Sequence, residues 1–117
     1  MAIENKEFEA AKEEAKTADS RLIITLKKPV TYNEKTYSTL EFDFEKLTGE
    51  DALNIEDELA SIGKITVAPV FSGEYLIRMA AKACSEPIGS DLFRKLPIGD
   101  YNRIRSKARS FLLKSES

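Results

Sequence analysis

The chain has no histidine, one cysteine and five scattered glycines among its 117 residues. Without histidine, Ser-His-Asp and Cys-His catalytic arrangements and histidine-containing zinc sites are excluded. One cysteine, Cys84, cannot form an internal disulfide, which agrees with a reducing compartment. The glycines match neither G-x-x-x-x-G-K-[ST] nor G-x-G-x-x-G, so the sequence predicts no nucleotide-phosphate loop.

Long apolar runs are also missing. No stretch approaches the roughly 20 consecutive apolar residues that cross a bilayer. The first residues, Met-Ala-Ile-Glu-Asn-Lys-Glu, lack the apolar core of a signal peptide. With 42% hydrophobic and 32% charged residues, the composition is that of a soluble globular protein. We expect the protein to stay in the cytoplasm and not to associate with a membrane.

Carboxylates occur in pairs that could in principle perform acid–base chemistry. Glu41 and Asp43 lie on a predicted strand, and Asp57 and Glu58 lie on a predicted helix. Acid–base hydrolysis needs a cleft that separates the two pKa values. These acids alternate with or oppose the apolar positions, so we expect them to face water. Their spacing does not match a calcium-binding loop either. The sequence therefore predicts no enzyme activity, no metal and no cofactor.

Alternating apolar residues predict an antiparallel β-hairpin over residues 21–44. Leu22, Ile24 and Leu26 alternate with polar residues up to Pro29, which we expect to end the first strand because proline has no ladder donor. The segment 33–35 (Asn-Glu-Lys) fits the turn. The second strand directs Leu40, Phe42 and Phe44 inward. A lone hairpin is marginally stable, so other elements must cover its apolar face.

The remaining pattern is helical. A capping-box-like Thr48-Gly-Glu-Asp51 precedes an apolar stripe of Ala52, Ile55, Leu59 and Ile62, and Gly63 is placed to end that helix. A linker over 64–71 leads to a helix of about 73–84 and one or two helical turns over 90–96. The last helix begins near Asp100. The order predicts an α+β fold, with an N-terminal hairpin covered by three to four helices.

Two regions differ in character. Residues 1–18 are predicted to form a flexible or partly helical acidic tail, and 19–117 a single α+β domain. Residues 1–60 carry 15 acids and 8 bases, a balance of −7, whereas residues 61–117 carry 5 acids and 10 bases, a balance of +5. This asymmetry either steers a complementary partner or lets the two halves attract one another.

Several apolar residues fall outside the predicted core. Leu113 lies off the inner stripe of the last helix, and Tyr75 lies at the margin of its own helix. Such residues either mark a partner surface or are buried where the fold wraps round them. The residues we predict to bind a partner are Phe71, Tyr75, Phe111 and Leu113, and Ile23, Tyr37 and Val70 share the same ambiguity.

The last helix is also basic. Five bases and no acids occur between Tyr101 and Lys114, which is a pattern compatible with nucleic-acid binding through Arg103, Arg105 and Arg109. The chain as a whole is acidic, with a pI of about 5.3, and the bases surround the helix instead of forming one row. Bases near a helix C-terminus also complement the helix dipole. Nucleic-acid binding is therefore the alternative function.

The order of turns and helices resembles the small tail assembly chaperones of long-tailed phages and prophages. The similarity covers about residues 21–114 and contains no catalytic signature. The stretches that carry it are 29–40 (PVTYNEKTYSTL) with 47–51 (LTGED), 74–81 (EYLIRMAA), and 96–105 (LPIGDYNRIR) with 111–112 (FL).

The resemblance implies a protein that binds the tape measure protein, keeps this long helical chain soluble and helps tail tube subunits assemble around it. It implies residence in the cytoplasm of the bacterial host and absence from the mature virion. The family offers no defined motif of functional residues to transfer onto this sequence. Modest affinity per copy suffices where many copies bind one client, because avidity multiplies it.

Overall fold

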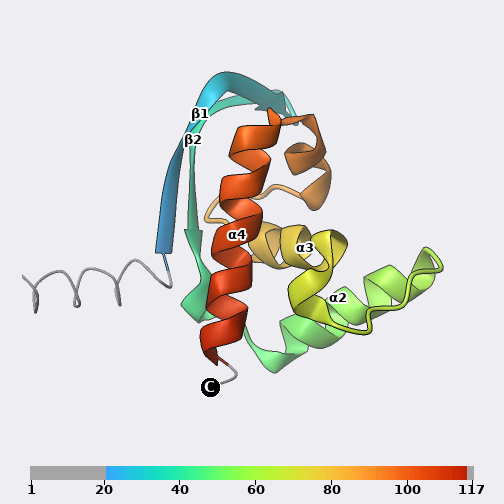
Figure 1. The fold of residues 1–117 in the computed structure, drawn as a ribbon. Coiled ribbons are helices and arrows are strands. Elements are labelled where there is room, and N and C mark those ends of the chain that lie inside the picture. Colours follow the sequence, from blue (N-terminus) through green and yellow to red (C-terminus); the bar gives the residue numbers. More distant parts are fainter. Residues whose placement is uncertain (1–20, 116–117) are drawn as a thin grey trace, which may run out of the picture.

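The computed structural model describes residues 21–115, so the predicted tail over 1–18 lies outside the described residues. A two-stranded antiparallel sheet is followed by helices that pack on one of its faces (Figure 1). The predicted α+β class is confirmed. In chain order the elements are β1 (Arg21–Tyr32), β2 (Lys35–Asp43), the 3-10 segment η1 (Phe44–Lys46), α2 (Gly49–Ser61), η2 (Pro69–Phe71), α3 (Gly73–Ala83), η3 (Ser90–Lys95) and α4 (Ile98–Ser115).

The hairpin turns at Asn33 and Glu34, as the sequence predicted. Both residues have positive φ, 50° and 69°, which is the backbone that a two-residue turn between twisted strands requires. On the inner face, Ile24, Leu40 and Phe42 are fully buried, in agreement with the predicted alternation. The outer face carries Ile23, which is 68% exposed.

Pro29 does not end the first strand, and the prediction that it would is wrong. β1 continues to Tyr32 through an irregularity in which Thr25 pairs with Thr39 and Val30 with Tyr37. β1 thus advances five residues while β2 advances two, and the extra residues bulge out of the ladder. Proline is tolerated in such a bulge because no ladder hydrogen bond needs its missing N–H.

The same irregularity explains why Tyr37 is buried, with 6% of its surface exposed, although the sequence placed it outside the core. On β2, Ser38 and Thr39 are both exposed between buried Tyr37 and Leu40. Opposite the bulge, the alternation of inward-facing and outward-facing residues on β2 therefore shifts by one residue. A bulge increases the local twist of the paired strands.

α2 begins and ends as its residues predict. The Thr48 backbone N–H donates to the Asp51 carboxylate at 2.9 Å, and Gly63 takes the left-handed conformation, φ 76°, beyond the helix end. Ile55 and Leu59 are buried. Ile62 is 52% exposed, contrary to its predicted place on the inner stripe, because the helix ends at Ser61 and the chain turns away there.

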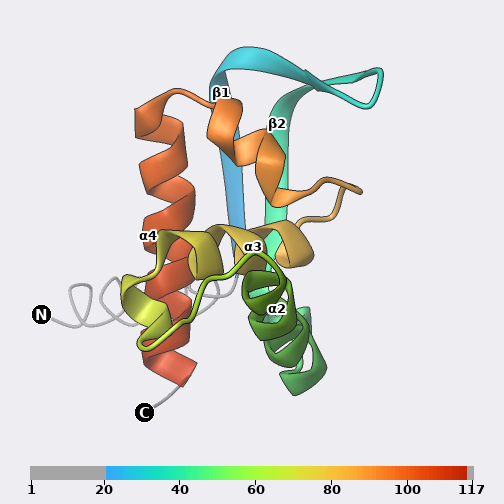
Figure 2. The ribbon, with the colours of Figure 1, turned by 90° about the vertical axis from the view of Figure 1, so that its right-hand side faces the viewer.

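α3 is the central covering element and crosses in front of the hairpin (Figure 2). Its Leu76, Ala80 and Ala83 are fully buried. The Phe42 ring of β2 packs against Phe93 of η3 with 5.9 Å between the ring centroids. The small alanines let the helix approach the sheet closely, and the hairpin gains the cover that a two-stranded sheet needs.

α4 starts at Ile98, two residues before the predicted position. Its Ile104 and Ala108 face the core and are fully buried. The Asp100 carboxylate in the first turn is also fully buried, and it accepts a hydrogen bond of 3.0 Å from the Lys27 backbone N–H. That N–H belongs to the bulge of β1, so Asp100 satisfies a donor that the irregular ladder leaves without a strand partner.

Candidate functional site

The four predicted partner-binding residues lie on η2, α3 and α4 and differ in exposure. Phe71 is 71% exposed and Leu113 46% exposed, so both are on the surface. Phe111 is half-buried, and its ring stacks on Phe44 with 5.6 Å between centroids. Tyr75 is 6% exposed, so its predicted position at the margin is wrong. The tyrosine is buried because α2 packs beside α3 there, and Tyr75 and Ile55 line the same cavity.

Tyr75 and Phe111 nevertheless line the same apolar cavity, of about 220 Å³, between α2, α3 and the end of α4. Two of its polar lining residues already bond to each other, since the Asp51 carboxylate accepts the Thr48 backbone N–H. Ligand pockets usually exceed about 300 Å³, so this cavity has room for a side chain and not for a drug-sized ligand. The lining residues are Leu47, Thr48, Asp51, Ala52, Ile55, Tyr75, Met79, Phe111 and Leu112.

The densest exposed apolar surface is the segment 62–71, which joins α2 to α3. Ile65 and Val67 are 90% and 92% exposed. Four of the eight large exposed hydrophobic residues of the described chain fall in these ten positions: Ile62, Ile65, Val67 and Phe71. Isolated exposed apolar residues are ordinary, but such a concentration is typical of an interaction surface. We call these four residues the apolar segment.

Local contacts hold the apolar segment in place and leave most of its apolar surface exposed. Lys64 forms an ion pair of 3.2 Å with Glu74. The Ser72 hydroxyl accepts the Tyr75 backbone N–H at 3.1 Å and caps α3, so Phe71 immediately precedes a fixed helix start. The Arg109 guanidinium lies over the Phe71 ring, 5.6 Å from its centroid.

The sequence prediction missed Ile65 and Val67 and placed Ile62 in the core. A signal was present, because Ile65-Thr66-Val67 lies between Gly63 and Pro69 with no helical period and no second strand to pair with. Apolar β-branched residues in such a position have no predicted place to be buried.

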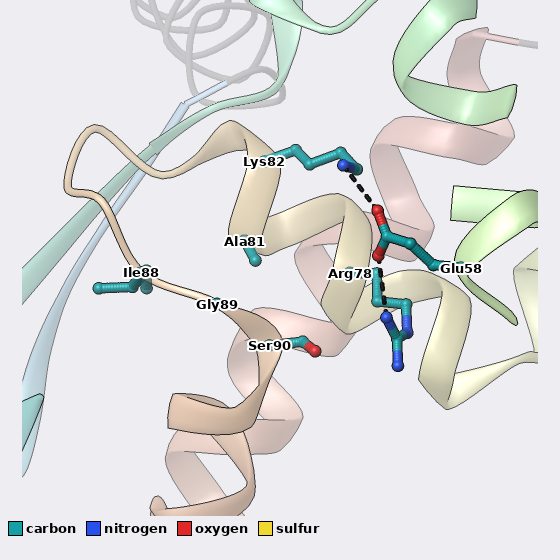
Figure 3. Close-up of a pocket in the computed structure, with 7 residues that line it drawn as sticks. All are labelled: Glu58, Arg78, Ala81, Lys82, Ile88, Gly89 and Ser90. Carbon is teal, nitrogen blue, oxygen red and sulfur yellow. Dashed lines mark hydrogen bonds and ion pairs between the residues drawn. The ribbon is translucent and has the colours of Figure 1, made fainter. Parts of the chain in front are cut away.

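A cluster of ion pairs connects α2 to α3. Glu58 pairs with Arg78 and Lys82, each at 2.9 Å (Figure 3). Burial raises the pKa of Glu58, but the hydrogen bonds from Lys82 and Arg78 outweigh it and leave the pKa below its ordinary value. The sequence placed Glu58 on a solvated face, and the half-buried ion pairs correct that. The adjoining hollow of about 280 Å³ is lined by these three charged side chains, which already pair with one another.

The cysteine and the strand carboxylates that were considered for catalysis each have separate surroundings. Cys84 is 5% exposed, and burial raises the pKa of its thiol. Glu41 pairs with Arg21 at 3.0 Å, and Asp43 accepts the Glu45 backbone N–H to cap η1. Among residues 21–115, no three His, Cys, Asp or Glu side chains gather in a group that could hold a metal ion. No described helix is long and apolar enough to cross a membrane.

The bases of α4 point in several directions. Arg103 approaches the Asp100 carboxylate at 3.9 Å, whereas Arg109 lies over Phe71 on another side of the helix. Arg105 packs beside Gly73 at the start of α3. The predicted distribution of bases around the helix therefore agrees with the structure.

Comparison of the chain with protein-family models, with curated proteins and with solved structures finds no match.

Proposed function

We propose that this protein is a phage tail assembly chaperone that binds the tape measure protein, keeps it soluble and assists assembly of tail tube subunits around it. The observation that carries the proposal is the apolar segment, four large hydrophobic residues exposed within ten positions. The resemblance of residues 21–114 to that family of chaperones supplies the identity of the client.

A chaperone of this kind needs apolar surface that is exposed while the protein itself remains folded. Here the core is complete without the apolar segment, since Phe42, Phe44 and Phe93 are buried elsewhere. The segment is therefore available to a client at no cost in core packing. Weak contacts suffice, because many copies along one long client act together. The proposed place of action is the cytoplasm of the bacterial host, with the protein absent from the finished virion.

The test is co-expression with the tape measure protein of the same genome, followed by size-exclusion chromatography. We expect the client to become soluble and to co-elute with the chaperone. Ile65→Ser should reduce co-elution severalfold, because burying one large aliphatic side chain contributes about 1.5–3 kcal/mol. Ile23→Ser is the matched control, since Ile23 is also exposed but lies on the outer face of the hairpin. A client that stays insoluble with or without this protein would contradict the proposal.

The alternative function is a nucleic-acid-binding module that uses α4. It has some support, because Arg105 and Arg109 have no carboxylate partner among the described residues. Phosphate recognition by a helix favours bases aligned along one face, and the bases of α4 surround it. The apolar segment also has no role in such a module, so protein binding explains more of the surface.

A further inference from the structure

One face of α4 carries a row of exposed or half-buried side chains, of which Tyr101 also packs against the core. Ile98 is 77% exposed and Leu113 46% exposed, and residues between them recur every three or four positions. This spacing places them on one side of an α-helix. We call this row, together with the Phe71 ring beside it, the α4 stripe: Ile98, Tyr101, Arg105, Arg109, Leu113 and Phe71.

The start of α3 and η2 run alongside the α4 stripe and give it a wall. A Cβ added at Gly73 would lie 2.9 Å from the Tyr101 hydroxyl and 3.7 Å from the Arg105 guanidinium carbon. One turn further on, Arg109 covers Phe71. In Figure 2, α4 passes the N-terminal end of α3, which is where these contacts occur.

At its N-terminal end the α4 stripe opens into a cavity of about 370 Å³. Ile98 and Tyr101 form the α4 side of this cavity, and Ile77 and Phe93 lie opposite. From Ile98 to Leu113 the stripe is about 22 Å long at 1.5 Å per residue, which matches roughly four turns of a second helix. A helix face of this length that carries apolar residues along it can pack against a second helix laid alongside.

The charged residues of the α4 stripe itself are of one sign, and the Glu74 carboxylate that lines the cavity is already paired with Arg94 and Lys64. Arg105 and Arg109 have no carboxylate partner among residues 21–115, and the two lie between Tyr101 and Leu113 in the row, with the Arg109 guanidinium over the Phe71 ring. A guanidinium flanked by apolar surface loses water when a partner covers it, and a carboxylate on that partner compensates the loss. The α4 stripe therefore selects a partner with acidic side chains next to an apolar face.

We infer that the α4 stripe binds an amphipathic helix whose apolar face is flanked by Asp or Glu residues. The inference rests on the proposed function, since the helix would be a segment of the client. Nucleic acid fits the stripe less well, because Ile98, Phe71 and Leu113 would face phosphates, and only two of the five bases of α4 belong to the stripe. The α4 stripe would thus bind those helical segments of the long client that carry acidic side chains beside an apolar face.

The test uses two fluorescently labelled peptides of about 18 residues with the same leucine face. One has glutamates along its flank and the other has lysines at the same positions. By fluorescence anisotropy with the full chain we expect the glutamate peptide to bind about tenfold more tightly. Arg109→Glu should remove most of this preference, and Lys28→Glu, an exposed base on β1, should leave it unchanged. Circular dichroism establishes that both variants are folded.

Equal binding of the two peptides, or tighter binding of the lysine peptide, would overturn the inference. So would a labelled DNA or RNA oligonucleotide whose binding depends on Arg109 and falls steeply between about 50 mM and about 200 mM salt, because the stripe would then serve phosphates. Failure here is distinguishable from failure of the proposed function. The co-expression experiment reports on the client itself and does not depend on the charge of the peptide flank.

Discussion

β2 and the apolar segment contain similar apolar residue types, but β2 buries them and the apolar segment exposes them. β2 buries Tyr37, Leu40 and Phe42, whereas the apolar segment exposes Ile65, Val67 and Phe71. β2 has a ladder partner in β1 and helices over its inner face, so its apolar side chains meet other apolar side chains. The segment between α2 and α3 has neither a strand partner nor a covering helix. Hydrophobicity alone therefore does not decide which residues form the core and which remain available to a partner.

The largest expected effect separates two phenylalanines. Phe42→Ala should lower the free energy of unfolding by about 3–5 kcal/mol, because it removes a ring that packs on Phe44 and Phe93 inside the core. Phe71→Ala should change it by less than about 0.5 kcal/mol, because its ring is mostly exposed. Urea denaturation followed by circular dichroism measures both. Equal losses for the two variants would show that Phe71 belongs to the core.

An intermediate effect is expected where the irregular part of β1 meets α4. Asp100→Ala leaves the part-buried Lys27 backbone N–H without its acceptor and should cost about 1–3 kcal/mol of unfolding free energy. Asp57→Ala, at an exposed position of α2, is the control and should change stability by less than about 0.5 kcal/mol. If the two substitutions prove equally mild, the bulge of β1 does not depend on this hydrogen bond.

The smallest expected effect concerns the ion pairs beside the apolar segment. Hydrogen bonds from Arg94, against the opposing effect of burial, hold the pKa of Glu74 below its ordinary value, with a further contribution from Lys64. A lowered folded-state pKa stabilises the protein above the unfolded pKa, and this stabilisation is lost as the pH falls through the folded pKa.

Between about pH 6 and about pH 3, Glu74→Gln should therefore lose less unfolding free energy than the wild type, by up to about 1 kcal/mol. Urea denaturation at the two pH values measures the difference. Asp57→Asn should leave the wild-type pH dependence in place. A Glu74→Gln variant with the full acid sensitivity of the wild type would assign that sensitivity to other carboxylates.

Much of the fold was predictable because its elements follow local patterns. Alternation placed Ile24 and Phe42 inside the hairpin, and the caps at Thr48 and Gly63 bounded α2. The absence of an N–H on Pro29 predicted that β1 would end there. The strand continues because Pro29 lies in a bulge, where no ladder hydrogen bond needs that N–H. Tyr37 was misplaced for the same reason, since that bulge shifts the inward phase of β2.

The candidate site was predictable in part. The sequence placed Phe71 and Leu113 outside the predicted core and left their burial open, and both are exposed. Tyr75 was misplaced because helical spacing gives its angle on α3 but not the position of α2 beside it. The row of α4 from Ile98 to Leu113 also escaped prediction. Its residues share a helical face in the sequence, but only the position of α3 shows that the N-terminal end of this face forms one side of a cavity.

The sequence by itself determined the order of the elements, the hairpin turn and the helix caps, since each depends on residues a few positions apart. The tertiary structure decided which apolar residues are covered. Burial depends on contacts between distant segments, such as Tyr75 with α2, Asp100 with β1 and Phe71 with α4. The exposure of the apolar segment and the cavity beside the α4 stripe therefore depend on how the helices pack, which the sequence alone does not give.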